Sequence, residues 1–238
     1  MKIALIGYGK MGKAIEEIAL QNGHEVVLKI SIENVEDKTI ENLQKADVAI
    51  EFTGPESAVE NLQLCFEAGV PVVSGSTGWL DRWEDIRTAC DEKNGSLIYA
   101  SNFSIGVNLF FELNTYLAAL MNQYDMYDIK MEEIHHTQKK DAPSGTAITL
   151  AEQILQNIAR KKAWVNQQPS SADELEIVSK RIDPAPGTHI IKYTSPIDDI
   201  EIIHTAHNRT GFAAGAVKAA EFLKDKKGIY TMKDVLGL

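Results

Sequence analysis

A glycine-rich turn directly after the first apolar run constrains the fold of this chain most. Residues 2–6 form a short, mostly apolar run, which predicts a strand. A helical pattern starts near Met11 and continues to about Gln21. Between them the sequence reads G-x-G-x-x-G over Gly7, Tyr8, Gly9, Lys10, Met11 and Gly12. Glycines allow a tight turn and a close approach to a pyrophosphate, whose charge the helix amides and the helix dipole would meet. The context favours dinucleotide binding over a glycine turn that merely packs.

The first hundred residues alternate between two periodicities. Strand-like runs are expected at 24–30, 47–52, 71–74 and 97–100, and helical stretches separate them. Strands that alternate with helices of ten to fifteen residues indicate a parallel sheet with helices on both faces. This part of the chain therefore predicts a doubly wound, nucleotide-binding architecture.

The pattern changes after Phe103. Long helices are expected at 106–122 and 144–162, and a polar loop at 164–173. Alternating apolar and polar residues predict strands, as in antiparallel sheets, at 127–134, 176–181, 189–195 and 200–207. Such a sheet leaves one face open, and self-association would cover it.

A helical pattern returns at 212–223, and residues 231–234 resemble a capping box, so we expect the end of the chain to return to the first domain. The predicted fold class is α/β, a Rossmann-type doubly wound parallel sheet with a second α+β domain that contains an open, mostly antiparallel sheet. The expected domains are 1–103 plus 210–238 for dinucleotide binding, and 104–209 for substrate binding and oligomerisation.

Composition excludes several classes of function. With 24 Lys and Arg against 34 Asp and Glu, the net charge of −10 argues against binding to nucleic acid or an anionic membrane surface. The apolar run at the N-terminus is too short for a signal peptide, and none approaches the roughly 20 residues of a membrane span. Cys65 and Cys90 lack metal-ligand spacing, so we expect no disulfide and no metal site, in a reducing cytoplasm.

The end of the second predicted strand leaves the cofactor open. A dinucleotide fingerprint places an acidic residue there to bind the ribose hydroxyl. The sequence offers Glu33 if the strand is long, or Ser31 if it stops early. Because Lys29 or Lys38 could favour a 2′-phosphate, both NADH and NADPH remain candidates.

A basic segment follows the strand expected at 127–134. Residues 133–147 read EIHHTQKKDAPSGTA, with two imidazoles and two amines before a helix start. That start could bind a carboxylate through the Gly145 and Thr146 amides and the Ser144 and Thr146 hydroxyls. The alternative is that Ser144 simply caps the helix and the histidines form a surface pair. Metal binding by His135 and His136 together is disfavoured because adjacent strand side chains point to opposite faces.

The same segment carries a family resemblance. It resembles the H-H-x-x-K-x-D-x-P-S-G-T-A signature of 4-hydroxy-tetrahydrodipicolinate reductases, and further matches follow the family order along the whole chain. These matches are Gly7 to Gly12, Gly75-Ser76-Thr77-Gly78, Ser101 to Asn108, and Arg209 with Phe212 to Ala216. The chain departs from the family in a glycine turn one residue shorter, in Ser76, where the family commonly has threonine, and in the displaced acid of the second strand.

The resemblance implies a function and a set of residue roles. The expected reaction transfers hydride from NADH or NADPH to 4-hydroxy-tetrahydrodipicolinate, giving tetrahydrodipicolinate and water in lysine and diaminopimelate synthesis. His135 would be the acid/base and Lys139 the proton donor, while the substrate carboxylates would be held by His136, Ser144, Gly145 and Thr146. The nicotinamide would be lined by Gly75, Ser76 and Thr77 and reached by Ala100, Ser101, Asn102 and Phe103.

The resemblance also implies a homotetramer whose antiparallel sheets pack together, and it assigns no role to Arg209. The alternatives are another amino-acid-pathway dehydrogenase, which would lack the string from Lys139 to Ala147, and a nucleotide-sensing module, which would need no carboxylate-binding loop.

Overall fold

The chain forms two compact units in the computed structural model, which describes residues 1–208 and 210–238. The first unit combines Met1–Ile105 with Thr210–Leu238, and the second comprises the residues between them. None of the helices among the described residues is long and apolar enough to cross a bilayer.

A parallel sheet of six strands forms the centre of the first unit, in the order β11-β5-β4-β3-β1-β2. The strands are β1 (Lys2–Ile6), β2 (Glu25–Ile30), β3 (Val48–Glu51), β4 (Val72–Ser74), β5 (Ser96–Tyr99) and β11 (Gly228–Tyr230). All four residues of β3 and all three of β4 are buried, because helices cover both faces of a parallel sheet.

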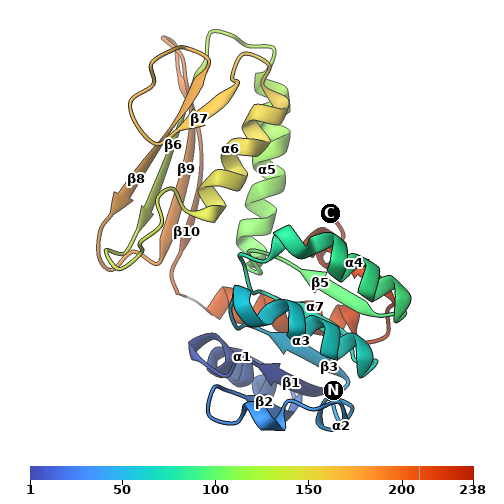
Figure 1. Cartoon of the computed structure of the whole chain (residues 1–238). Coiled ribbons are helices and arrows are strands. Elements are labelled where there is room, and N and C mark those ends of the chain that lie inside the picture. The colour runs from blue at the N-terminus through green and yellow to red at the C-terminus, as the bar shows by residue number, and fades with distance from the viewer. Residues whose placement is uncertain (209) are drawn as a thin grey trace. The chain divides into compact units, whose positions relative to one another are not determined.

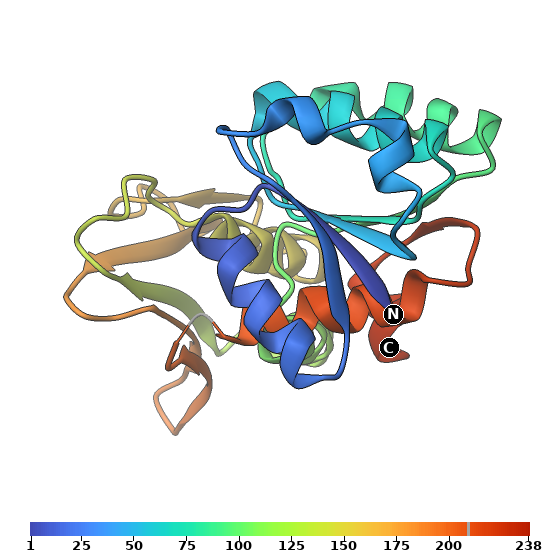
Figure 2. The same cartoon turned by 90° about the horizontal axis from the view of Figure 1, so that it is seen from below.

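Helices cover this sheet in two layers, which Figure 2 shows from the side. The helices of the unit are α1 (Lys10–Gln21), α2 (Ile40–Leu43), α3 (Pro55–Glu67), α4 (Trp83–Glu92), α7 (Thr210–Leu223) and α8 (Met232–Leu236), with 3₁₀ turns η1 (Val35–Asp37) and η2 (Leu80–Arg82). One apolar core lies between the sheet and α1, α7 and α8, and a second lies between the sheet and α3 and α4. Pro55 opens α3 at a position where its missing amide hydrogen costs nothing.

The strand order reverses direction between β1 and β3. From β1 the chain passes to β2 on one side and then returns to β3 on the other. Open α/β sheets bind their ligands beyond the carboxyl ends of the strands at such a reversal. Gly7 follows β1 at this edge, Phe52 and Thr53 follow β3, and Gly75 follows β4.

The second unit contains a five-stranded sheet in the order β10-β9-β6-β8-β7. Its strands are β6 (Asp128–His135), β7 (Ala163–Val165), β8 (Glu174–Arg181), β9 (Gly187–Thr194) and β10 (Asp199–Ala206), and its helices are α5 (Ile105–Met121) and α6 (Gly145–Asn157). Both helices lie along one face of the sheet (Figure 1) and enclose an apolar core with it. On β10, Ile202 packs against this core, whereas the next residue, Ile203, is 55% exposed.

The structure confirms the predicted fold class, but the second sheet is mixed. β6 and β7 pair with β8 in parallel, whereas only the β6–β9 and β9–β10 pairs are antiparallel. The expected long helix at 144–162 already ends at Asn157, and β7 then forms where a loop was expected to begin. This crossover from β6 through α6 makes the parallel pairing possible, since parallel neighbours need a long connection.

The C-terminal segment completes the first sheet. β11, which the sequence analysis did not predict, pairs in parallel with β5. The capping box at 231–234 is confirmed at the start of α8, where the Thr231 amide donates to Asp234 Oδ2 at 2.7 Å. Gly215 of α7 lies so close to the backbone at Phe103 that a Cβ on Gly215 would come 1.7 Å from the Phe103 carbonyl oxygen.

We predict that Gly215→Ala destabilises the protein although alanine favours helices. The added methyl cannot fit against the backbone, and overpacking of this kind costs about 1–3 kcal/mol, so Tm should fall by at least about 2 °C in a thermal melt. Gly211→Ala in the same helix is the matched control, since its Cβ would lie at an ordinary 3.6 Å from Ser104 Oγ. Equal Tm values for the two variants would contradict the close contact.

Candidate functional site

The three glycines of the turn have different physical roles. Gly7 has φ +98°, and a Cβ there would lie 2.0 Å from the Phe52 carbonyl oxygen; at Gly12 it would lie 2.5 Å from the Gly7 oxygen. Packing therefore requires both of these glycines. At Gly9, by contrast, a Cβ would meet none of the described atoms within 4 Å. The absence of a side chain at Gly9 keeps space open above the turn, and this is what a ligand-binding turn needs.

A pocket of about 300 Å³ lies at this edge of the sheet. It is lined by Gly7, Gly9, Lys10, Met11, Phe52, Thr53, Gly54, Pro55, Gly75, Ser76 and Thr77. Gly9 is the N-cap of α1 and supplies no side-chain cap to the first amides of the helix. The pocket therefore combines open amides and the positive end of a helix dipole, which suits a phosphate group.

The pocket brings together most of the residues predicted from the sequence to bind cofactor. Tyr8, Gly12 and residues 100–103 are not among its described lining residues. The Tyr8 hydroxyl donates to Glu16, and Phe103 is buried with its ring centroid 5.7 Å from that of Phe52.

The end of β2 offers no carboxylate to a ribose. The strand ends at Ile30, so Ser31 takes the position after it, and Glu33 lies two residues further in an exposed turn. Lys29 Nζ lies 2.5 Å from Glu16 Oε1. Lys38 Nζ lies 2.9 Å from Glu60 Oε1 and donates to Asn61, so both lysines already have partners.

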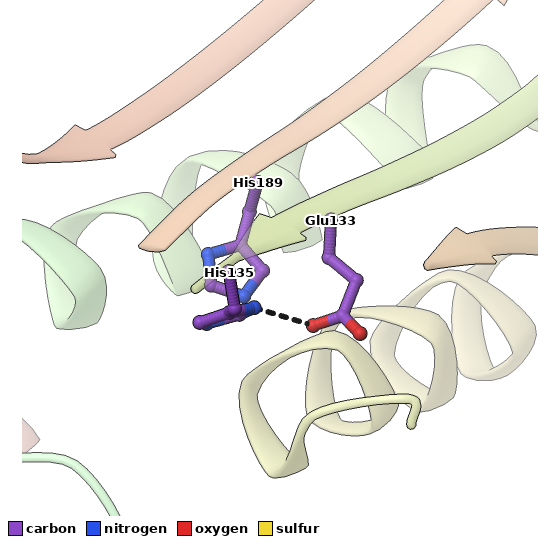
Figure 3. A group of neighbouring side chains, drawn as sticks. All are labelled: Glu133, His135 and His189. Atoms are coloured by element: carbon purple, nitrogen blue, oxygen red, sulfur yellow. Dashed lines mark ion pairs between the residues drawn. The ribbon is translucent and has the colours of Figure 1, made fainter. Parts of the chain in front are cut away.

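The second unit holds a cluster that the strands assemble by register (Figure 3). Glu133 and His135 are two residues apart on β6 and therefore share a face of the sheet. His189 on β9 is the antiparallel partner of Glu133. All three side chains are buried on the face that α5 and α6 cover.

Glu133 is the charged centre of this cluster. Its Oε2 lies 3.0 Å from His135 Nδ1, and its Oε1 accepts hydrogen bonds from Arg181 Nη2 at 3.0 Å and from the Ser144 amide at 3.2 Å. Burial would raise the pKa of Glu133, but these contacts and Ser179 outweigh burial and hold the pKa well below its ordinary value. The carboxylate is therefore ionised and ties β6 to β8 and to the start of α6.

His189 is a neutral member of the cluster. Its Nε2 lies 3.3 Å from Ser144 Oγ, and its ring contacts that of His135 edge-on at 5.2 Å between centroids. Burial and the charge of His135 lower the pKa of His189 to about 3. The sequence analysis missed Glu133, Arg181 and His189, because only the strand register brings them together.

The loop between β6 and α6 presents the remaining predicted residues. Lys139 Nζ contacts both Asp141 carboxylate oxygens at 2.8 Å, and this pairing lowers the pKa of Asp141 despite its partial burial. Ser144 caps α6 by accepting from the Ala147 amide at 3.2 Å, so it does act as the N-cap. Gly145 is exposed and Thr146 half-buried at the start of the helix.

Glu133, His135 and His189 also have the composition of a metal site. Each offers one ligand atom, and the three atoms lie within 4.8 Å of one another. The Arg181 guanidinium already occupies Glu133 Oε1, and its positive charge opposes a bound cation. The cluster is therefore better suited to a hydrogen-bonded network around Glu133 than to a metal ion.

Two family profiles match the chain. That described as dihydrodipicolinate reductase, N-terminus, matches residues 1–103, and that described as dihydrodipicolinate reductase, C-terminus, matches 106–236. The chain belongs to the dihydrodipicolinate reductase family. A 4-hydroxy-tetrahydrodipicolinate reductase of Christiangramia forsetii is 51% identical over 99% of this chain and 98% of its own length. One from Neisseria meningitidis is 37% identical over 94% of this chain and 84% of its own length.

A solved structure shows the same fold. The dipicolinate-bound dihydrodipicolinate reductase of Paenisporosarcina sp. TG-14 superposes with a TM-score of 0.77 at 24% identity, and the match covers 97% of each chain. The comparisons confirm the resemblance stated from the sequence, and with it a reductase that uses NADH or NADPH. The family match at Arg209 lies outside the described residues.

We predict that His189 makes the stability of the protein fall in acid. Below pH 6.5 the unfolded chain protonates this histidine, whereas the folded protein does so only near pH 3. Stability is thus lost as the pH falls through this window, by up to about 1.4 kcal/mol per pH unit. His189→Asn should flatten the dependence of the unfolding midpoint on pH below 6.5. Parallel curves for the variant and the parent would refute this.

Proposed function

We propose that His135 and Lys139 deliver the proton in the reduction of 4-hydroxy-tetrahydrodipicolinate, and that the glycine-lined pocket binds NADH or NADPH. The observation that carries the proposal is the buried Glu133–His135 pair, to which the Ser144 amide is joined directly and the Lys139 loop through Arg181, which donates to both Glu133 and the Asp141 carbonyl oxygen. This cluster combines an oriented imidazole, an ammonium group and a helix start in one segment. An anionic substrate that must be protonated needs these groups.

The chain's residues fit a dinucleotide at the pocket. Gly9 leaves room that a side chain would fill, and the first amides of α1 can bind a pyrophosphate. The loops that carry Thr53 and Ser76 form the wall we assign to the nicotinamide. When bound, the reduced nicotinamide supplies the hydride. We extend the nicotinamide-binding role to Ala100, Ser101, Asn102 and Phe103 only through the family resemblance.

Glu133 would orient His135 for its task. Its carboxylate faces Nδ1, and on the other side of the ring a Cβ at Gly187 would meet Nε2 at 3.1 Å. Because Gly187 lacks that atom, Nε2 has space to exchange a proton with substrate. Because His189 is neutral, it adds no second positive charge beside His135. The Lys139 ammonium would then be the proton donor that works together with His135.

The substrate carboxylates would bind at the start of α6 and to the adjacent imidazole. Gly145 and Thr146 supply amides, and Ser144 and Thr146 supply hydroxyls, at the positive end of the helix, and His136 precedes them in the loop. Charge-assisted hydrogen bonds to such an anion contribute roughly 1.5–3 kcal/mol each. In this proposal the second unit is the substrate-binding domain.

We also propose that the protein is a homotetramer whose second units pack through their open sheet faces. Ile203 is 55% exposed on β10 and stands opposite half-buried Ile190 of β9. An apolar patch on a sheet face favours association. Light scattering after size exclusion tests this, and a monomeric mass would refute it. We propose a cytoplasmic location as well, which fits two buried cysteines, Cys65 and Cys90, that form no disulfide with each other.

The function is tested by following oxidation of NADH and of NADPH separately, with the freshly made condensation product of pyruvate and aspartate semialdehyde. Rapid oxidation of either cofactor supports the proposal and ranks the two. Cofactor binding without oxidation would refute the substrate assignment.

We predict that Lys139→Ala lowers kcat by about 100-fold or more, because general acid catalysis contributes at least that much. The Kd for cofactor should stay within about twofold, since the lysine lies in the second unit. Its exposed neighbour offers a matched control: Lys140→Ala removes the same charge and should retain kcat. A loss of equal size in both variants would show that only the charge of the loop matters.

We predict that His136→Ala acts mainly on substrate binding. The loss of one charge-assisted contact should raise the substrate KM by about tenfold or more, with a smaller effect on kcat. Steady-state kinetics at saturating cofactor measure both constants. An unchanged substrate KM together with weakened cofactor binding would remove His136 from the substrate site.

A further inference from the structure

A second buried carboxylate lies directly behind the cofactor pocket. Glu51, the last residue of β3, is 0% exposed. Its Oε2 accepts a hydrogen bond from Ser74 Oγ at 2.7 Å, and its Oε1 accepts from Ser76 Oγ at 2.7 Å and from the Thr53 amide at 3.0 Å. The Thr53 hydroxyl also donates to Oε1. Neutral groups therefore supply all of these contacts.

Two of the three donor residues line the pocket. Ser76 and Thr53 belong to the loops after β4 and β3, and their own hydrogen bond, from the Thr53 amide to Ser76 Oγ at 2.8 Å, joins the loops. Glu51 thus lies one hydrogen bond behind the pocket wall. Among the described residues no lysine, arginine or histidine forms an ion pair with it.

A structural role alone would not call for a charge at this position. A buried carboxylate loses its hydration, and neutral donors compensate for this only in part. An uncharged residue could join the same loops at a lower desolvation cost. What a glutamate can add here, over an uncharged residue that makes the same hydrogen bonds, is a negative charge close to the pocket wall in a medium of low dielectric constant.

We propose that Glu51 is a positioning residue whose charge favours the oxidised cofactor in this pocket. The proposal depends on the assignment of the nicotinamide to the wall formed by Thr53 and Ser76. Loss of a hydride, with its two electrons, from C4 converts the neutral dihydronicotinamide into a cation. A fixed negative charge nearby stabilises that cation and the transition state leading to it, but not the neutral reduced ring.

The test compares Kd values for the oxidised and the reduced cofactor in the full-length protein. Glu51→Gln keeps the shape and removes the charge. We expect it to weaken binding of the oxidised form by at least about fivefold relative to the reduced form, and to lower kcat. Glu51→Asp, which retains the charge, should keep more of the preference. Glu67→Gln removes a surface charge at the end of α3 and should leave the ratio unchanged.

Three results would overturn the proposal or its premise. Equal weakening of both forms by Glu51→Gln would reduce Glu51 to a structural role. Unchanged affinity for both forms, in Glu51→Gln and in Ser76→Ala, would instead show that the nicotinamide lies elsewhere, so the proposed function fails separately. If Glu51→Gln does not fold, the Ser76→Ala variant still tests whether the affinity ratio depends on the carboxylate or on the Ser76 hydroxyl. This variant keeps the carboxylate and should keep the affinity ratio, and a lost ratio would assign the effect to the hydroxyl.

Discussion

A carboxylate buried at a strand end must find donors inside the protein, and both candidate sites are built around this requirement. In the second unit Glu133 draws Arg181 from β8, the Ser144 amide from the start of α6 and His135 from its own strand. Burying an ionised carboxylate without partners costs much free energy. The hydrogen bonds that compensate for this cost also fix the positions of the donors. The geometry of the cluster around Glu133 is thus a by-product of charge compensation.

The first unit meets the same requirement without a cation. Hydroxyls and an amide from β4 and from the loops after β3 and β4 converge on Glu51, and the two loops form one wall of the pocket. A wall fixed by several short hydrogen bonds loses little entropy on binding, since its side chains are already ordered. The two units therefore reach preorganisation by different chemistry, one with an arginine and one with neutral donors.

Local sequence was sufficient for the elements whose signals are local. The glycine turn, the alternating strands and helices up to residue 100 and the serine cap of α6 all follow from short-range patterns. The partners of those residues did not follow. His189 lies beside Glu133 only because of the register of β9 on β6. Glu51 falls within an apolar strand pattern, which gives no indication of its hydrogen-bond partners. The mixed sheet was missed for the same reason, because strand pairing is decided by a crossover and not by periodicity.

The place of β11 has a consequence for synthesis on the ribosome. This strand and α7 belong to the first unit, yet they are synthesised after the whole of the second unit. The second unit is continuous and can fold as soon as it leaves the exit tunnel, whereas the nascent first unit still exposes the edge of β5 and the apolar face that α7 later covers. Such surfaces are prone to aggregation. We therefore expect the N-terminal part of the first unit to be more prone to aggregation during synthesis than the completed unit is.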